Sequence, residues 1–237
     1  MTMRLLILAG GFGTRLRELI PDRPKPLALI SGRPFLGYLL EQWQSVGISN
    51  FTFLLHFQAD QIIRFLESNQ SGLLKESSLT TIVEPDPLGT GGSIANAIRL
   101  KSLQEPFLVA NADTWVKINI AELSKATPPA IGVIKVSNIQ RFGAVNLDES
   151  GVVVGFTEKG STQGLGLINA GVYHLTPELF SDWNGEAFSL EQVLFPDMAR
   201  QRLLSAVPMH GDFIDIGVPE DYHRFCRWVE TGRSFPL

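Results

Sequence analysis

The segment directly after the first apolar run of the chain combines glycines with positive charge. Met3–Leu8 reads as a buried strand, and the glycine-rich stretch Ala9–Thr14 follows it at once. Glycines let the backbone approach a ligand closely, and their N–H groups can point at phosphate oxygens. Arg15 adds a fork of donors suited to phosphate, and Lys25 adds a mobile point charge. Together these residues predict a cradle for a nucleoside triphosphate.

Two common phosphate-binding patterns do not fit this cradle. The Walker loop requires a Gly-Lys pair, which the chain lacks, and the dinucleotide fingerprint requires a glycine at the position of Leu16. The pattern G-G-x-G-T-R-L, followed by K-P from Lys25, instead resembles the sugar-nucleotide pyrophosphorylases, also called nucleotidylyltransferases. This resemblance implies a Rossmann-like α/β fold of the GT-A type. Its open, mostly parallel sheet has flanking helices and a β-rich sugar-binding insertion.

Two isolated acids follow apolar segments further along the chain. Asp113 comes just past the predicted strand Phe107–Ala110, and Asp215 stands alone within the apolar run Phe213–Gly217. In open α/β sheets the carboxyl ends of strands face the ligand crevice, and Mg²⁺ prefers few carboxylates plus water and phosphate oxygens. The resemblance implies the same two metal ligands. The family usually has Gly-Asp where this chain has Ala112 before the acid, and the extra methyl group is expected to narrow the space beside the metal.

Residues of the second half resemble the sugar-binding motifs of the family. Glu158 and Lys159 match its E-K motif, which implies a sugar hydroxyl contact for the acid and a sugar phosphate contact for the lysine. Asn169 matches an asparagine that binds a sugar hydroxyl, and Gly143 a glycine whose backbone approaches the sugar. A solvated charge pair at a strand end remains the alternative for the E-K residues.

The segment Glu84–Gly92 lies between a predicted strand and a predicted helix and resembles the base-reading loop of the family. Its glycines would let the backbone approach the nucleobase. A carboxylate offers two adjacent acceptors, which match the adjacent N1–H and N2–H₂ donors of guanine but repel the carbonyl oxygens of uracil and thymine. Glu84 therefore favours guanine if it faces the base. An exposed acid before a proline-rich turn remains the alternative.

The resemblance implies a reaction in which a sugar phosphate oxygen attacks the α-phosphorus of GTP in line, releasing pyrophosphate and leaving a GDP-sugar. The residues implied for catalysis are Arg15, Lys25 and Asp113, with Asp113 and Asp215 holding Mg²⁺. Those implied for nucleotide binding are Ala9, Gly10, Gly11, Gly13, Thr14, Glu84, Gly89, Thr90, Gly91 and Gly92. Those implied for the sugar phosphate are Gly143, Glu158, Lys159 and Asn169.

Within the family, the resemblance is strongest to guanylyltransferases acting on D-glycero-α-D-manno-heptose 1-phosphate. Mannose 1-phosphate guanylyltransferases and N-acetylmuramate 1-phosphate uridylyltransferases are the enzyme alternatives. A catalytically silent subunit that binds sugar nucleotide is the alternative from another class. The presence of Arg15, Lys25, Asp113 and Asp215 argues against that silent subunit.

Alternating strand and helix patterns must position these residues. The first half predicts strands at 51–55, 80–83 and 107–110 and helices at 35–46, 58–68 and 92–100. The second half predicts strands at 130–136, 143–147, 152–157 and 167–175, a capping box at 189–192 that opens a helix to about residue 200, and a last helix from Pro219. We expect one domain over 1–237, with a nucleotide-binding half to about 125 and a sugar-binding half from about 126.

Composition limits the partners of the chain. Its 237 residues carry a net charge of −4, so no global basic field favours nucleic acid. The single cysteine, Cys226, excludes an internal disulfide and suits a reducing cytosol, and no apolar run approaches the length of a membrane span. The four histidines lack metal-ligand spacing. We expect a cytoplasmic enzyme with no nucleic-acid or membrane partner, and a homodimer remains open.

Overall fold

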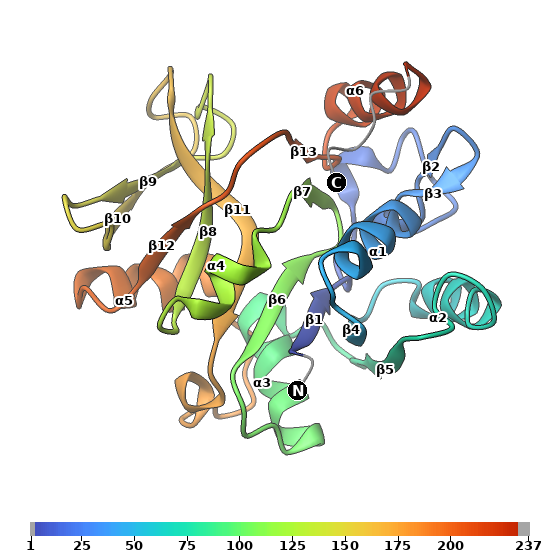
Figure 1. The fold of residues 1–237 in the computed structure, drawn as a ribbon, viewed down its shortest axis with the longest axis horizontal. Coiled ribbons are helices and arrows are strands. Elements are labelled where there is room, and N and C mark those ends of the chain that lie inside the picture. Colours follow the sequence, from blue (N-terminus) through green and yellow to red (C-terminus); the bar gives the residue numbers. More distant parts are fainter. Residues whose placement is uncertain (1–2, 232–237) are drawn as a thin grey trace. The chain divides into compact units, whose positions relative to one another are not determined.

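Strands and helices alternate through the first half of the chain (Figure 1). The computed structural model describes residues 3–231. Its first elements are β1 (Arg4–Leu8), β2 (Leu29–Ile30), β3 (Arg33–Pro34), α1 (Phe35–Ser45), β4 (Asn50–Leu55), α2 (Ala59–Ser68), β5 (Ser78–Val83), α3 (Gly89–Lys101) and β6 (Phe107–Asn111). Short 3-10 turns cover Thr14–Leu16 and Lys25–Leu27. The predicted alternation is confirmed.

The second half is rich in strands, as predicted. Its elements are β7 (Thr114–Val116), α4 (Ile120–Lys125), β8 (Ala130–Val136), β9 (Ala144–Leu147), β10 (Val153–Thr157), β11 (Gly166–Leu175), a 3-10 turn (Pro177–Phe180), a π-helical turn (Leu190–Leu194), α5 (Phe195–Arg200), β12 (Ser205–Pro208), β13 (Phe213–Asp215) and α6 (Pro219–Glu230). The helix predicted after Ser189 is present, and Gln192 N–H donates to the Ser189 hydroxyl at 3.2 Å. Its first turn is π-helical rather than α-helical.

Two compact units share these elements. One unit contains residues up to 87, 110–117 and 211 onward, and the other contains 88–109 and 118–210. The strand order is β12-β8-β11-β6-β1-β4-β5, and β6 contributes residues to both units. The pairs β1–β4, β4–β5 and β12–β8 are parallel, whereas β11–β8 is antiparallel. The chain therefore has the mostly parallel sheet with flanking helices that the sequence predicts.

Aromatic residues fill the core of the first unit. Trp43 of α1 packs on Phe51 of β4 with ring centroids 6.2 Å apart, so this contact fixes the helix against the strand. Phe225 and Trp228 of α6 pack against Trp115 of β7, and the two tryptophan rings meet edge-on at 4.7 Å. Both tryptophans are buried, so they belong to the core of this unit.

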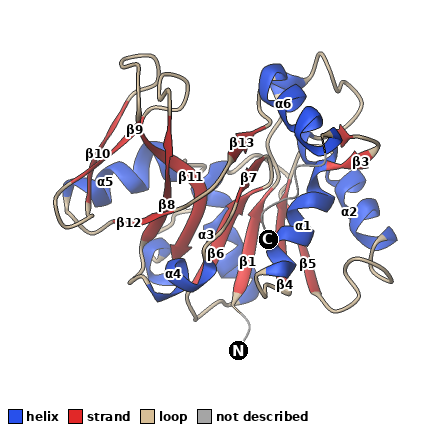
Figure 2. Cartoon of the chain, turned by 45° about the horizontal axis from the view of Figure 1, so that its top comes forward, coloured by secondary structure: helices blue, strands red, loops and turns tan. Residues whose placement is uncertain are grey.

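The core of the second unit lies around β8 and β11. Tyr173 is fully buried, and its ring centroid lies 4.9 Å from that of Phe195 in α5. His174 is 3% exposed, and its Nδ1 atom lies 3.1 Å from the carbonyl oxygen of Ala126, so it is held within this core. The β9–β10 hairpin lies beside α5 (Figure 2). No helix within residues 3–231 is both long enough and apolar enough to cross a membrane.

Candidate active site

The glycine loop after β1 is shaped partly by its own neighbours. A Cβ atom on Gly10 would lie 3.2 Å from both Cβ and N of His56, so a side chain there would be crowded. Gly13 has φ +62°, a left-handed conformation that favours glycine, and a Cβ there would lie 3.4 Å from Cγ of Lys25. A Cβ on Gly11 would meet no described atom within 4 Å. Packing therefore accounts for Gly10 and backbone conformation accounts for Gly13, whereas the space beside Gly11 is open to a ligand.

The rest of the loop leads into an exposed turn. Ala9 N–H donates to the carbonyl oxygen of Leu54 at 3.0 Å, which extends the parallel pairing of β1 and β4 into the loop. Thr14 and Arg15 begin the 3-10 turn and are exposed. Within residues 3–231, the Arg15 guanidinium has no hydrogen-bond or carboxylate partner, so it is available to an anionic ligand.

Lys25 and Asp113 form an ion pair although 88 residues separate them. Lys25 Nζ lies 2.6 Å from Asp113 Oδ2, and the two side chains are 13% and 31% exposed. Burial by itself would raise the pKa of the Asp113 carboxyl. The Lys25 ammonium and the Thr114 hydroxyl, which donates to Oδ1 at 3.2 Å, outweigh burial and hold that pKa below its usual value. Asp113 is therefore ionised at neutral pH.

The second predicted metal ligand lies on the neighbouring strand. β13 pairs antiparallel with β7, so that Asp215 is opposite Thr114, and Ile216 N–H donates to the carbonyl oxygen of Asp113 at 3.0 Å. Gly217 N–H donates to Asp215 Oδ1 at 2.7 Å. A Cβ on Gly217 would lie 2.7 Å from that oxygen and 3.3 Å from Lys25 Nζ. The structure thus brings both predicted acids and the predicted lysine together.

This group of charges fits a magnesium ion that is also bound by phosphate. Within residues 3–231, no three His, Cys, Asp or Glu side chains are arranged to hold a metal ion by themselves. Mg²⁺ is usually held by only one or two carboxylates, with waters and substrate phosphates completing its coordination. Two carboxyl groups, one just before β7 and one at the end of its partner strand β13, are oxygen donors of the kind that such a hard cation prefers.

Glu84 lies immediately after β5 and is 4% exposed. Its N–H donates to the carbonyl oxygen of Leu55 at 2.8 Å, and its own carbonyl oxygen lies 3.0 Å from Nδ1 of His56. Glu84 is therefore not the exposed acid of the alternative interpretation. Its contact with a base stays a prediction.

The glycines that begin α3 accommodate Phe188, a residue that the sequence analysis did not single out. A Cβ on Gly91 would overlap the Phe188 ring, and one on Gly89 would lie 2.5 Å from the Phe188 carbonyl oxygen. That oxygen accepts hydrogen bonds from the N–H groups of Gly91 and Gly92 at 2.9 and 3.3 Å. Packing therefore explains part of this glycine pattern, and its approach to a nucleobase stays a prediction.

Two predicted ligand-binding residues of the second unit belong to one hydrogen-bonded chain. Thr90 Oγ1 donates to Glu191 at 2.7 Å, and Asn169 Nδ2 donates to the Tyr173 hydroxyl at 3.2 Å. The Tyr173 hydroxyl in turn donates to Glu191 at 3.2 Å. Sequence reasoning missed Tyr173 and Glu191 as site residues. The capping box at 189–192 includes the acid, but that pattern does not indicate its contact with the tyrosine.

The remaining sugar-site residues gather at the end of β10. Gly143 has φ +78°, and a Cβ on it would lie 2.5 Å from the carbonyl oxygen of Thr157. Its backbone therefore lies directly against the start of the E-K motif. Glu158 and Lys159 are exposed, and their side chains have no hydrogen-bond or ion-pair partner among residues 3–231. Because both side chains are exposed, they could either bind the sugar phosphate or form only a solvated charge pair, so their role stays a prediction.

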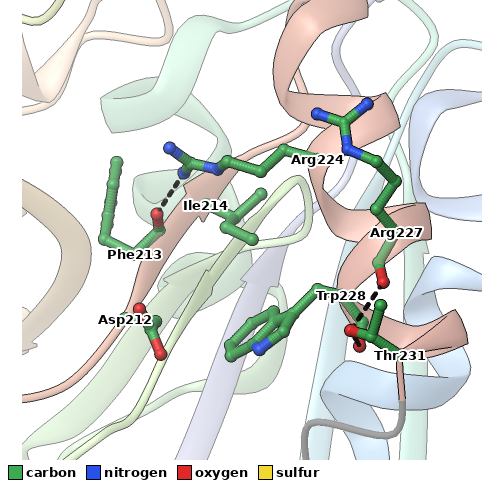
Figure 3. A pocket seen from close by; sticks show the side chains of 7 residues that line it. All are labelled: Asp212, Phe213, Ile214, Arg224, Arg227, Trp228 and Thr231. Atoms are coloured by element: carbon green, nitrogen blue, oxygen red, sulfur yellow. Dashed lines mark hydrogen bonds between the residues drawn. The ribbon is translucent and has the colours of Figure 1, made fainter.

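A separate cavity of about 640 Å³ lies between β13 and α6 (Figure 3). It is lined by Asp212, Phe213, Ile214, Arg224, Arg227, Trp228 and Thr231, none of which is a predicted site residue. The Arg224 guanidinium reaches from α6 and donates to the Phe213 carbonyl oxygen at 2.6 Å (Figure 3). This bond ties β13, which carries Asp215, to the last helix.

Comparisons with known proteins identify the family of the chain. The sequence model of the nucleotidyl transferase family matches residues 4–231. A D-glycero-alpha-D-manno-heptose 1-phosphate guanylyltransferase of Campylobacter jejuni is 34% identical over 94% of this chain and 98% of its own length. A mannose-1-phosphate guanylyltransferase of Arabidopsis thaliana is 35% identical over 93% of this chain, which spans only 63% of that relative.

Solved structures with a similar fold include two of one protein. The crystal structure of HddC from Yersinia pseudotuberculosis is similar with a TM-score of 0.85 and 34% identity, over 96% of this chain and all of that one. A second structure of HddC, complexed with GMP-PN, is similar with a TM-score of 0.83 over the same shares of the two chains.

Proposed function

The chain belongs to the nucleotidyl transferase family, and on this premise we propose that it makes a GDP-sugar and pyrophosphate from GTP and a sugar 1-phosphate. The observation that carries the proposal is that Lys25, from a 3-10 turn, meets Asp113 and Asp215, two acids at strand ends, in the unit that holds the glycine loop. The names of similar proteins, both guanylyltransferases, support GTP as the nucleotide.

The sugar that we propose is D-glycero-α-D-manno-heptose 1-phosphate. The heptose enzyme from Campylobacter jejuni, which is 34% identical over 98% of its own length, supports this sugar. This chain spans 60–63% of the length of the mannose enzymes. Mannose 1-phosphate is the second candidate, because the identity to its enzymes is as high as that to the heptose enzyme.

The reaction needs no enzyme nucleophile. An oxygen of the sugar phosphate forms a bond to the α-phosphorus of GTP, and the bond from that phosphorus to the oxygen bridging to the β-phosphate breaks, with pyrophosphate leaving. Catalysis is then positioning of the reactants and stabilisation of charge in the transition state. The residues needed are cations for the triphosphate, donors for the sugar phosphate and groups that orient the sugar ring.

The first unit supplies the residues for the triphosphate. The exposed Arg15 guanidinium binds phosphate oxygens, and the glycine loop offers N–H groups beside it. Lys25 keeps the Asp113 carboxylate ionised and in place before substrate arrives. Asp113 and Asp215 are the residues that would hold Mg²⁺, which when bound neutralises charge on the phosphates.

The second unit supplies the residues for the sugar. Lys159 aligns the incoming phosphate, because its exposed ammonium group is a compact charge on a flexible side chain that can follow the phosphate oxygens. Glu158 and Asn169 bind sugar hydroxyl groups, and the tight approach of Gly143 to the end of β10 leaves its backbone beside them. Glu84, in the first unit, is the proposed reader of guanine.

A matrix of nucleotides and sugars tests the proposal. GTP, UTP and dTTP are each paired with heptose, mannose and N-acetylmuramate 1-phosphates at saturating Mg²⁺, and pyrophosphate release is measured. We expect the highest kcat/KM for GTP with the heptose phosphate. Faster turnover of UTP with N-acetylmuramate 1-phosphate would replace the proposal with the uridylyltransferase. No pyrophosphate release from any pair, with a GDP-sugar still bound, would identify a silent binding subunit instead. We place the activity in the cytoplasm, where GTP and sugar phosphates are available.

A further inference from the structure

A carboxylate outside the predicted site lies at the centre of a hydrogen-bonded chain in the second unit. Glu191 belongs to the π-helical turn and is partly buried. Its Oε2 atom accepts hydrogen bonds from Thr90 Oγ1 at 2.7 Å and Ser189 Oγ at 2.8 Å. Its Oε1 atom accepts a hydrogen bond from the Tyr173 hydroxyl at 3.2 Å. Hydrogen bonds to an ionised acceptor are stronger than neutral ones, so this carboxylate organises the groups around it.

The chain of hydrogen bonds continues to Asn169. The Tyr173 hydroxyl accepts a hydrogen bond from Asn169 Nδ2 at 3.2 Å, while Asn169 Oδ1 accepts one from Gly171 N–H at 2.9 Å. The Tyr173 ring is fully buried against Phe195, so its hydroxyl has little freedom to move. Asn169 keeps one N–H and one oxygen lone pair for another partner.

The Glu191 carboxylate and the Gly171 N–H fix the directions of the hydrogen bonds between them. A carboxylate can only accept, so the Tyr173 hydroxyl must donate to it and present a lone pair to Asn169. The Gly171 N–H can only donate, so the amide oxygen of Asn169 must face it. Both ends therefore require the same orientation of the Asn169 amide.

The other end of the chain reaches the start of α3. Thr90 Oγ1 donates to Glu191 and accepts a hydrogen bond from Leu190 N–H at 2.9 Å. Glu191 is thereby bonded both to a predicted nucleotide-binding residue and, through Tyr173, to a predicted sugar-binding residue. Sequence separations of 101 residues to Thr90 and 18 to Tyr173 show that the fold brings these groups together.

We propose that Tyr173 and Glu191 are positioning residues that hold the Asn169 amide in the orientation required by a sugar hydroxyl group. The inference rests on the proposed function, in which Asn169 contacts the sugar. The Tyr173 hydroxyl contacts Asn169 directly and Thr90 only by way of Glu191, whereas Glu191 contacts Thr90 directly and Asn169 by way of Tyr173. Tyr173→Phe should therefore affect mainly the sugar phosphate, and Glu191→Ala should affect both substrates.

A double-mutant cycle tests the inference. Tyr173→Phe, Asn169→Ala and the double variant are compared for kcat and for the KM of each substrate. We expect Tyr173→Phe to raise the KM for sugar 1-phosphate about 5- to 10-fold and to leave that for GTP within about twofold. In the Asn169→Ala background the same change should have no further effect. An equal effect in both backgrounds, or an equal rise of both KM values, would overturn the inference.

Tyr222→Phe is the matched control, because its hydroxyl donates to the Leu29 carbonyl oxygen at 2.7 Å in the first unit. It should leave the KM for sugar 1-phosphate unchanged. Glu191→Gln keeps an acceptor oxygen for Tyr173, so it should restore most of the sugar affinity that Glu191→Ala loses. If Tyr173→Phe does not fold, the two Glu191 variants are compared in the presence and absence of Asn169→Ala. Their difference in sugar affinity should then vanish in the Asn169→Ala background.

Binding separates failure of the inference from failure of the proposed function. Pyrophosphate release by the unmodified protein tests the function. If that release is absent, the same double-mutant cycle is measured as changes in the Kd for GDP-mannose by titration calorimetry. Losses of affinity in Tyr173→Phe and Asn169→Ala that do not add in the double variant still support the inference. A protein that neither turns over nor binds a GDP-sugar would overturn both.

Discussion

The ammonium of Lys25 lies 2.6 Å from a carboxylate oxygen of Asp113, so one of the two proposed metal ligands already holds a cation within the protein. Asp215 is bonded to Gly217 beside them, at a point where a single Cβ would touch both Asp215 and Lys25. A Mg²⁺ ion held by Asp113 and Asp215 would therefore share one small volume with the Lys25 ammonium. Phosphate oxygens are the groups that can draw the lysine away from Asp113 as substrate binds.

Replacing Lys25 with methionine should strengthen metal binding while it slows turnover. The change removes the cation that competes for Asp113, so Mn²⁺ should bind the nucleotide-free variant several-fold more tightly, as measured by electron paramagnetic resonance. The loss of charge stabilisation on the triphosphate should lower kcat. Lys75→Met, at an exposed lysine, is the control. Weaker Mn²⁺ binding in Lys25→Met would show that the lysine supports the metal site rather than competing with it.

Asp113→Ala and Asp215→Ala should each reduce turnover severely without unfolding the protein. Loss of metal-based charge stabilisation costs several kcal/mol of barrier, which corresponds to about 100-fold or more in kcat. Pyrophosphate release and circular dichroism measure the two effects. Rates near those of the unmodified enzyme, either in a variant or in the presence of a chelator, would contradict the assignment of these acids.

Arg15→Ala and Lys159→Ala should fail in different ways. The exposed Arg15 follows the glycine loop, so its loss should slow chemistry and raise the KM for GTP. Lys159 follows β10, and its loss should raise mainly the KM for sugar 1-phosphate. Steady-state kinetics with each substrate varied in turn measure the division. A Lys159 variant that loses affinity for GTP alone would show that the E-K motif has been assigned incorrectly.

Glu84→Gln should relax the preference for guanine. The amide places a donor where the carboxylate had a second acceptor, so one donor of guanine loses its partner in a partly desolvated pocket, at a cost of about 1–3 kcal/mol. The same amide can pair with an N–H and a carbonyl group of uracil. The ratio of kcat/KM for GTP to that for UTP should therefore fall. An unchanged ratio would mean that guanine, if preferred, is read by the backbone of Gly89–Gly92.

His174 should make folding stability fall as pH decreases through the ordinary imidazole pKa of 6.5. Burial lowers the pKa of its imidazole below the usual value of 6.5, so the unfolded chain binds a proton more readily than the folded protein. Stability therefore falls as pH decreases through 6.5 and levels off below the folded pKa. His174→Gln should flatten this part of the curve in thermal unfolding measured at several pH values. The exposed His223→Gln should leave the curve unchanged, and an equal effect of the two substitutions would contradict the assignment.

The sequence by itself determined the elements that repeat with a local period and the residues that carry charge. The short apolar run Leu5–Ile7 predicts a strand that is buried on both faces, and its three side chains are indeed buried. Amphipathic spacing predicts α1 and α2. The glycines of the first loop and the two isolated acids were recognisable because few roles need those residue types at strand ends. Burial of Glu84 did not follow from its sequence, since flanking prolines are compatible with either a buried or an exposed turn.

The tertiary structure alone decided which side chains meet. The pairing of Lys25 with Asp113, the packing of Phe188 against Gly91 and the bonds of Glu191 each join groups far apart in the chain. The short strands β7 and β13, which bring the two acids together, were also absent from the prediction, because three-residue strands have too few positions to show a period. Local sequence patterns indicate which side chains are buried and which are exposed to solvent. Hydrogen bonds and ion pairs depend on directions and distances that exist only once remote segments have packed together.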